Sequence, residues 1–371
     1  MTSHSGTISI LMAFLVCFEF VSCGGIESEV ARNQYISNDC TSRPVWLLGH
    51  AANCHRTLKS VLAEGGNGVE IDVASDESVK GTFWSVAHDH FVSASAMEEY
   101  NRSISSEEDY WVSLETYLKY DEMNDICLLW LDNKNDDAGY LKELVEYVHR
   151  ITEQEYEGGL PPYSIIYGMY YVKDLDTYTT DGEPVLSWLR DNLKDNEGIN
   201  VAWEELTEKG DDQKVIDLFE KYNFPYTKHL FSNGYHNSAL VGRNSSYVAD
   251  LSIAHSLMRK GKFCSRIAFW TAQSGWDADW FFDTEATRYR HDSIVKTDCD
   301  VVLTECNNDM VTPGSKNALK DAYSQYLDTN GKYYGQWNAG RCRLATQKDA
   351  FWSSNLIPIH IQKCPHMRTP Q

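Results

Sequence analysis

Basic residues are scarce in this sequence. Its 371 residues include 33 lysines and arginines against 54 acidic residues, which gives a formal net charge of -21. Non-specific binding to nucleic acid or to an anionic membrane depends on clustered lysine and arginine, so this charge argues against both kinds of partner. Any phosphate group that the chain handles must therefore be held by a few local side chains.

Several common motifs are also missing. There is no Cys-x-x-Cys pair and no cluster of histidine and cysteine, which argues against a zinc site. A doubly wound nucleotide-binding sheet needs a glycine-rich turn after its first strand, but the first predicted strand here is followed by the turn His50 to Asn53. Low-complexity stretches are absent too, so the chain can bury a large hydrophobic core.

Long apolar runs are absent after the N-terminal region. Within residues 1–23 the run Ile8–Val16 precedes the small residues Ser22 and Cys23, which predicts a secretory signal peptide and an extracellular protein. The alternative is a membrane anchor, although the run is shorter than the roughly 20 residues of a bilayer span. We therefore expect residues 24–371 to form a single secreted domain without a transmembrane span.

The cysteine count and two sequons fit an oxidising compartment. Eight cysteines follow the predicted signal peptide, an even number that favours disulfides, although their pairing cannot be read from the sequence. The sequons at Asn101 and Asn244 are compatible with a glycoprotein. The eight cysteines are Cys40, Cys54, Cys127, Cys264, Cys299, Cys306, Cys342 and Cys364.

Short apolar, β-branched or aromatic runs alternate with longer segments of helical spacing. Eight runs predict strands: Val45–Gly49, Gly68–Val73, Ile126–Asp132, Ser164–Tyr171, Asn200–Glu204, Thr227–Ser232, Arg266–Thr271 and Asp300–Glu305. The helical candidates are Asp137–Gln154, Pro184–Lys194, Asp212–Tyr222 and Ser246–Arg259. An eightfold alternation in a chain of this size predicts an α/β fold of the (β/α)8 TIM-barrel type, with an open doubly wound sheet as the weaker alternative.

Ionisable and aromatic residues gather at the ends of these strands, where a barrel places its active site. They are His50 after the first strand, Glu70 and Asp72 on the second, Asp132 on the third, Trp270 near the end of the seventh and Glu305 at the end of the eighth.

Three of these residues form a set of oxygen donors. Glu70 and Asp72 lie two apart on a strand and share a face, where two carboxylates need a cation or a shared proton. Asp132 on the neighbouring strand completes a set without sulfur or imidazole, which favours one Mg²⁺ ion over Ca²⁺ or Mn²⁺. Taken alone, the Glu-x-Asp pair could equally be a solvated strand end.

Two histidines extend this set towards catalysis. About 50 residues separate the second and third strands, more than one crossover helix needs, and they include an apolar run from Phe83 that ends in His88. We read this segment as an excursion over the barrel mouth, with a hairpin, that delivers His88. His50 and His88 would supply the base and the acid for phosphodiester cleavage, with His90 as a competitor for the second role.

Two further residues are candidates for substrate binding. Lys134, two residues after Asp132, is placed to contact a phosphate oxygen, although its spacing fits a surface lysine equally well. Trp270 is placed to stack on a quaternary ammonium such as choline, although strand tryptophans more often pack in a core.

Five stretches of this sequence together resemble a known family. Arg43–Asn53, Gly65–Val73, the run ending at His88, Leu128–Lys134 and Ile267–Thr271 occur in the order found in the sphingomyelinase D / phospholipase D toxins of spider venom, which are related to glycerophosphodiester phosphodiesterases. Arg343–Asn355 also resembles that family's tail motif, Ala-Thr-x-x-Asp-x-x-Trp, which plugs the far end of the barrel.

The resemblance implies a role for each candidate residue. Glu70, Asp72 and Asp132 would be magnesium ligands, His50 and His88 the catalytic pair, Lys134 a phosphate contact and Trp270 part of the choline pocket. The family cleaves sphingomyelin or lysophosphatidylcholine between phosphate and choline and typically leaves a cyclic phosphate. The expected partner is thus a choline- or ethanolamine-bearing phospholipid at a membrane or lipoprotein surface, cleaved by a monomer.

This chain departs from the family pattern in two places. Residues 89–125 contain no cysteine where the family has a loop disulfide, and Glu305 stands where the family has asparagine. Two alternatives therefore stay open: hydrolysis of soluble glycerophosphodiesters, and a catalytically impaired lipid-binding homologue. The roles of Asn53, His90 and Glu305 are unassigned at this point.

Overall fold

A computed structural model gives the arrangement of most of the chain. It describes residues 43–63, 65–75, 83–87, 93–135, 140–169, 175–202, 211–234, 254, 257–258, 260–272, 301–305 and 342–352. The predicted signal peptide, His88, His90, the Asn244 sequon and most of the expected helix Ser246–Arg259 lie outside these residues.

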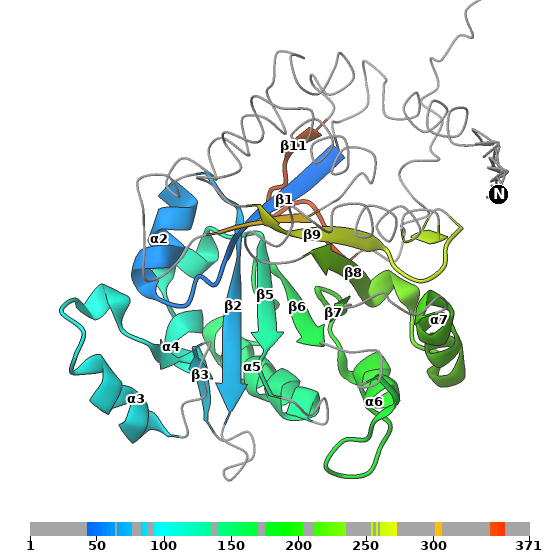
Figure 1. Cartoon of the computed structure of the whole chain (residues 1–371), viewed down its shortest axis with the longest axis horizontal. Coiled ribbons are helices and arrows are strands. Elements are labelled where there is room, and N and C mark those ends of the chain that lie inside the picture. Colours follow the sequence, from blue (N-terminus) through cyan, green and yellow to red (C-terminus); the bar gives the residue numbers. More distant parts are fainter. Residues whose placement is uncertain are drawn as a thin grey trace, which may run out of the picture.

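Eight parallel strands form the barrel (Figure 1). They are β1 (Arg43–His50), β2 (Gly68–Ser75), β5 (Leu128–Asn133), β6 (Ser164–Met169), β7 (Glu197–Ala202), β8 (His229–Gly234), β9 (Arg266–Ala272) and β10 (Val301–Glu305). Each pairs with the next in this order, and β1 pairs with both β10 and β2. Every barrel strand therefore has a neighbour on each side, and all eight predicted strands are confirmed.

Successive apolar side chains along these strands point alternately into and out of the barrel, which gives two apolar layers. Trp46, Leu48, Trp130, Ile166 and Leu303 are buried together inside the ring of strands. The residues between them on the same strands face outward and pack with the helices, in a second and larger cluster.

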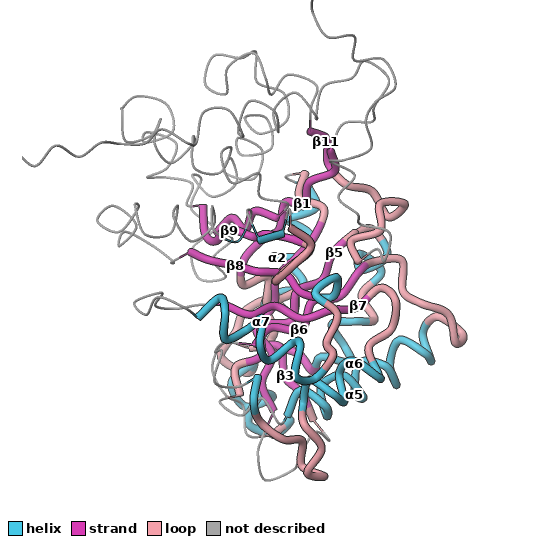
Figure 2. Tube along the Cα trace, turned by 90° about the vertical axis from the view of Figure 1, so that its right-hand side faces the viewer, coloured by secondary structure: helices cyan, strands magenta, loops and turns pink. Residues whose placement is uncertain are grey.

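The described helices lie outside the strands (Figures 1 and 2). The helical segments are α2 (His55–Ala63), α4 (Leu114–Leu118), η2 (Asp121–Asn124), α5 (Leu141–Glu155), α6 (Val185–Asn192), α7 (Asp211–Tyr222) and η5 (Tyr226–Lys228). In α5 the buried residues Leu141, Leu144, Val145 and Val148 recur at helical spacing, so one face of this helix packs on the sheet. The three expected helices at residues 137–154, 184–194 and 212–222 are thereby confirmed.

The described parts of the long connection from β2 to β5 form an excursion from the barrel. It contains β3 (Trp84–Val86), α3 (Ala94–Asn101), η1 (Glu107–Asp109) and β4 (Val112–Ser113), and β3 runs antiparallel to both β2 and β4. Two ion pairs, Arg56 to Asp109 at 2.7 Å and Lys59 to Glu108 at 2.8 Å, attach η1 to α2. The expected excursion with a hairpin is confirmed, and in Figure 1 α3 lies towards the end of the barrel to which the β2 arrow points.

The side chain of Asn101, the asparagine of the first sequon, joins α3 to the segment before β4. The side chain of Asn101 is buried, its Nδ2 donates to the carbonyl oxygen of Trp111 at 2.7 Å, and its Oδ1 accepts from the Trp111 backbone N–H at 3.0 Å. Glycan attachment would remove this clamp between α3 and the segment before β4. The folded structure therefore argues against Asn101 as a glycosylation site.

The C-terminal segment closes the opposite end of the barrel. Its strand β11 (Cys342–Leu344) pairs with the start of β1, and the next residue, Ala345, accepts a hydrogen bond of 2.9 Å from Asn67, just before β2. Phe351 packs edge-on against Trp46, and Trp352 Nε1 donates to the carbonyl of Ile165 at 2.9 Å. These contacts all lie where strands begin, so the expected plug by the tail motif is confirmed.

The disulfide prediction stays a prediction, because the side chains of five of the eight expected cysteines lie outside the described residues. Cys54, Cys127 and Cys264, whose side chains are described, are buried and are not bonded to one another. Burial also raises the pKa of the Cys127 thiol to about 11. An even number of cysteines does not show which side chains lie within bonding distance of one another.

None of the described helices combines the length and the apolar character that crossing a bilayer needs.

Candidate metal and catalytic site

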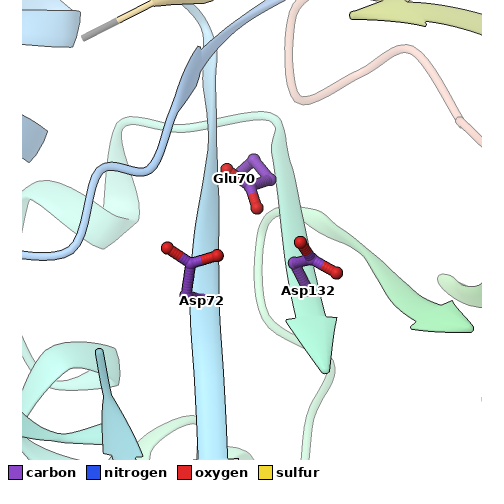
Figure 3. A group of neighbouring side chains, drawn as sticks. All are labelled: Glu70, Asp72 and Asp132. Atoms are coloured by element: carbon purple, nitrogen blue, oxygen red, sulfur yellow. The ribbon is translucent and has the colours of Figure 1, made fainter. Parts of the chain in front are cut away.

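The three predicted carboxylates lie together where β2 and β5 pair, near the C-terminal end of β5 (Figure 3). Asp72 and Asp132 are direct register partners on these strands, and Glu70 is paired with Trp130 two residues earlier. One carboxylate oxygen from each of the three acids lies within 4.8 Å of the others. The structure therefore brings together the acids that the sequence placed 62 positions apart at most, and their spacing suits a single cation.

Burial makes this cluster unusual. Glu70 and Asp72 are each only 1% exposed, and burial raises the pKa of Glu70 to about 8, although the His50 ring acts in the opposite direction. Within the described residues, Glu70 Oε1 is a buried oxygen with no hydrogen-bond partner. An oxygen left in this way is costly unless something satisfies it, so the donor set fits a hard divalent cation.

Lys134 lies inside the cluster and not on the surface. Its Nζ is 2.7 Å from Asp72 Oδ1 and 2.6 Å from Asp132 Oδ2. Burial acts to raise the pKa of Asp72, but the Lys134 ammonium and the Asn53 amide outweigh it and hold that pKa below its ordinary value. The ammonium thus offsets part of the negative charge of the two aspartates, and its role as a phosphate contact stays a prediction.

His50 lies beside the same cluster. Its Nε2 is 3.9 Å from Glu70 Oε2, and its side chain is 22% exposed, so the ring reaches both the acids and the solvent at the barrel mouth. The backbone register also pairs His50 with Glu305 at the end of β10. A histidine in this position can exchange a proton with a substrate group held next to the acids.

The second histidine of the predicted catalytic pair, His88, and its competitor His90 lie outside the described residues. The chain before them is well positioned, since the backbone N–H of Ala87 donates to the carbonyl oxygen of Asp72 at 3.0 Å. Trp270 lies near the end of β9 as expected, but its side chain, like that of Glu305, is outside the description.

The turn after β1 holds the acids, which the sequence did not reveal. Asn53 is a candidate to which the sequence assigned no role. Its Nδ2 donates to Asp72 Oδ2 at 2.6 Å. The backbone N–H of Ala51 donates to Glu70 Oε2, also at 2.6 Å. Two of the three acids are therefore fixed by a neighbouring segment of the chain.

Gly168 on β6 is a second contributor that the sequence did not reveal. A Cβ atom built at this glycine would lie 3.3 Å from Asp132 Oδ1 and 3.0 Å from the carbonyl oxygen of Leu131. Because Gly168 has no side chain, the Asp132 carboxylate can occupy this space on β6. In the sequence, a glycine within a strand does not indicate such a role, because glycine is also found at β-bulges.

We expect Gly168→Ala to weaken metal binding more than it weakens the fold. The added methyl group must displace the Asp132 carboxylate, because the neighbouring backbone oxygen cannot give way as easily. Isothermal titration with Mg²⁺ should show a Kd raised by about tenfold or more, as for other disturbances around metal ligands. A Kd equal to that of the wild-type protein would show that Asp132 has room to spare. Gly159→Ala, in the exposed turn after α5, is a control, because its Cβ would lie 3.0 Å from a backbone oxygen, that of Tyr156, far from the acids.

Comparison with solved structures finds barrel enzymes at low identity. A phosphoribosyl anthranilate isomerase from Thermotoga maritima is 8% identical with a TM-score of 0.30, covering 74% of this chain and 95% of that chain. A dihydropteroate synthase from Xanthomonas albilineans is 11% identical with a TM-score of 0.37, covering 78% and 94%. A glycerophosphoryl diester phosphodiesterase domain from Mycobacterium tuberculosis is 12% identical with a TM-score of 0.32, covering 71% and 96%.

Comparisons at the sequence level give a sharper result. A search of the curated proteins finds no match. The family model described as sphingomyelinase D/phospholipase D matches residues 40–280, which is more than half of the chain and includes His50, the three acids and Lys134. The match supports a phosphodiester-cleaving activity of the phospholipase D type. The chain belongs to the sphingomyelinase D/phospholipase D family.

Proposed function

We propose that this protein is a secreted, Mg²⁺-dependent enzyme that cleaves the bond between phosphate and head group in sphingomyelin or lysophospholipids. The observation that carries the proposal is the buried group of Glu70, Asp72 and Asp132, with His50 3.9 Å from Glu70 at the barrel mouth. The family match extends over all four residues. Ca²⁺ and Mn²⁺ are the less favoured ions for this all-oxygen set.

Each residue has a separate task in this proposal. The three acids would hold the ion, which supplies charge neutralisation at the phosphate when bound. Lys134 Nζ would contact a non-bridging phosphate oxygen. His50 would take the proton from the attacking hydroxyl of the lipid itself, and His88 would protonate the leaving choline oxygen. A new bond from that hydroxyl to phosphorus replaces the bond to choline, so the products are a cyclic phosphate and free choline.

Choline release is the direct test. The protein is incubated with sphingomyelin or lysophosphatidylcholine, with Mg²⁺ or with EDTA, and choline is assayed while phosphorus NMR identifies the phosphate product. We expect release only with Mg²⁺, a cyclic phosphate, and a fall of at least about 100-fold in His50→Ala, the usual range for a general acid or base. Release that is independent of metal and unchanged in His50→Ala would contradict the proposal.

The same experiment separates the two alternatives. Hydrolysis of glycerophosphodiesters would give glycerol phosphate from a soluble substrate and no cyclic product. A lipid-binding homologue without activity would retain lipid and release no choline at any Mg²⁺ concentration.

A further inference from the structure

We propose that Asn53 is a positioning residue that sets the metal affinity of the site, by fixing which oxygen of Asp72 is offered to the ion. The inference rests on the proposed function, because it requires a cation between Glu70, Asp72 and Asp132. It concerns the turn Ala51–Asn53, which joins β1 to α2 and touches β2 along its edge.

Asn53 grips Asp72 at two points. Its Nδ2 donates to the carboxylate oxygen Oδ2 at 2.6 Å, and its own Oδ1 accepts from the backbone N–H of Asp72 at 2.8 Å. The amide is only 3% exposed, so water does not compete for either bond. Because backbone and side chain are held by the same planar group, the Asp72 carboxylate is confined to one orientation.

The backbone of the same turn also holds Glu70 at two points. Ala51 N–H donates to Glu70 Oε2 at 2.6 Å, and Ala52 N–H donates to the Glu70 carbonyl oxygen at 2.8 Å. The other oxygen, Oε1, is buried and has no hydrogen-bond partner in the part of the chain that is described. On Asp72 the other oxygen, Oδ1, faces Lys134 at 2.7 Å. Glu70 and Asp72 thus each have one carboxylate oxygen held by the turn, which leaves the other oxygen for the space between the three acids.

The turn itself is held rigidly. Ala51 adopts a positive φ of 53°, a conformation that is unfavourable for alanine and persists only when its surroundings impose it. One such constraint is visible: the buried hydroxyl of Tyr117, on α4, donates to the carbonyl oxygen of Ala52 at 2.6 Å. Tyr117, 65 residues after Ala52 in the sequence, therefore stabilises the turn that holds the acids.

Loss of this orientation should show in metal affinity before anything else. Groups that orient metal ligands typically change affinity by about 10- to 100-fold when removed. In Asn53→Ala the carboxylate of Asp72 keeps its contact with Lys134 but loses the hydrogen bond that fixes its Oδ2, so binding weakens while the ligand set stays complete. Tyr117→Phe should act in the same direction and by less, because the turn loses one bond and Asn53 is still present.

Asn67, the residue before β2, provides a matched control. It is also buried, its Oδ1 accepts from the Leu47 N–H at 2.8 Å, and its Nδ2 donates to the Ala345 carbonyl. It lies just before β2, at the end of the barrel opposite to the acids. Asn67→Ala removes a comparable pair of hydrogen bonds without touching the site.

The experiment is calorimetric titration of the full chain with Mg²⁺, for the wild-type protein, Asn53→Ala, Tyr117→Phe, Asn67→Ala and Glu70→Gln, with thermal unfolding to show that each is folded. We expect Kd to rise about 10- to 100-fold in Asn53→Ala, and to stay within threefold of the wild-type value in Asn67→Ala. Choline release by Asn53→Ala should require correspondingly more Mg²⁺ and return towards the wild-type rate at saturation.

Three outcomes would overturn the inference. If the wild-type protein binds Mg²⁺, Glu70→Gln does not, and Asn53→Ala binds as the wild type does, only the role of Asn53 is wrong. If Asn67→Ala loses as much affinity as Asn53→Ala, the effect is a general weakening of the barrel. If the wild-type protein binds no Mg²⁺ at all, the proposed function fails at its cofactor and the inference falls with it.

Discussion

Glu70→Gln is expected to abolish metal-dependent cleavage and, in the same protein, to increase the resistance of the metal-free fold to unfolding at pH 8. The first effect follows from loss of a charged ligand among three, which we expect to lower choline release by at least about 1000-fold at fixed Mg²⁺. The second follows from burial, because Glu70 is 1% exposed and an ionised carboxylate in such a place is costly.

The pH dependence of unfolding distinguishes this explanation from a general repacking effect. Burial raises the pKa of Glu70 to about 8 in the folded protein. Between the ordinary value near 4.5 and about 8, the folded chain therefore keeps a proton that the unfolded chain releases, and the free energy of unfolding falls as the pH rises. Urea unfolding in EDTA from pH 5 to pH 8.5 should show this decline in the wild-type protein and a flatter profile in Glu70→Gln.

Glu197→Gln is the matched control for this experiment. Glu197 is equally buried on β7, but it accepts hydrogen bonds from His149 at 2.8 Å, from Tyr167 at 3.2 Å and from the Lys194 backbone N–H at 2.8 Å. Its replacement should lower stability and leave Mg²⁺ binding unchanged, since a satisfied buried carboxylate loses partners when it becomes an amide. Glu70→Gln with cleavage within tenfold of the wild-type rate would show that Glu70 is not a ligand.

Trp352→Ala is expected to cost about 3 to 5 kcal/mol in the free energy of unfolding, the range for removal of a large buried aromatic side chain. Trp352 is 6% exposed, packs edge-on against Phe351 and donates to the Ile165 carbonyl oxygen. Gly198 on β7 has no side chain where a Cβ would lie 2.6 Å from this indole. The barrel interior is thus shaped to the ring, and no nearby side chain can refill the space.

The same variant should leave the chemistry of the folded molecules unchanged. The tail contacts the start of the strands, and the acids lie at their other end, so Mg²⁺ affinity and choline release per folded molecule should match the wild-type values. Lys348→Ala, in the exposed turn of the tail, should change stability by less than about 0.5 kcal/mol. A loss below 1 kcal/mol for Trp352→Ala, measured by urea unfolding, would contradict the account of the tail as a structural plug.

The fold was predictable because its strands are buried on both faces, which gives short continuous apolar runs that stand out between segments of helical spacing. The acids were predictable for a related reason. Parallel strands end at the same side of a barrel, so Glu70, Asp72 and Asp132 could be brought together without knowledge of the register.

The remaining features depend on distances that no local pattern encodes. The sequence places Lys134 two residues after Asp132, but only the register shows that it also reaches Asp72. The Asn101 sequon carries no information on burial, and the clamp on Trp111 comes from tertiary packing. Gly168 and Tyr117 act on the site through space, from a neighbouring strand and from a helix.

The pairing of β1 has a consequence for the order of events during synthesis. This strand, residues 43–50, hydrogen-bonds to β10 at residues 301–305 and to β11 at residues 342–344. Both partners leave the ribosome about 250 to 300 residues later, which at 5–20 residues per second is tens of seconds of translation. Until then β1 has only β2 as a partner and its other edge stays unpaired, so chaperones that shield such edges are expected to matter more for this protein than for one whose first strand has both partners nearby in the sequence.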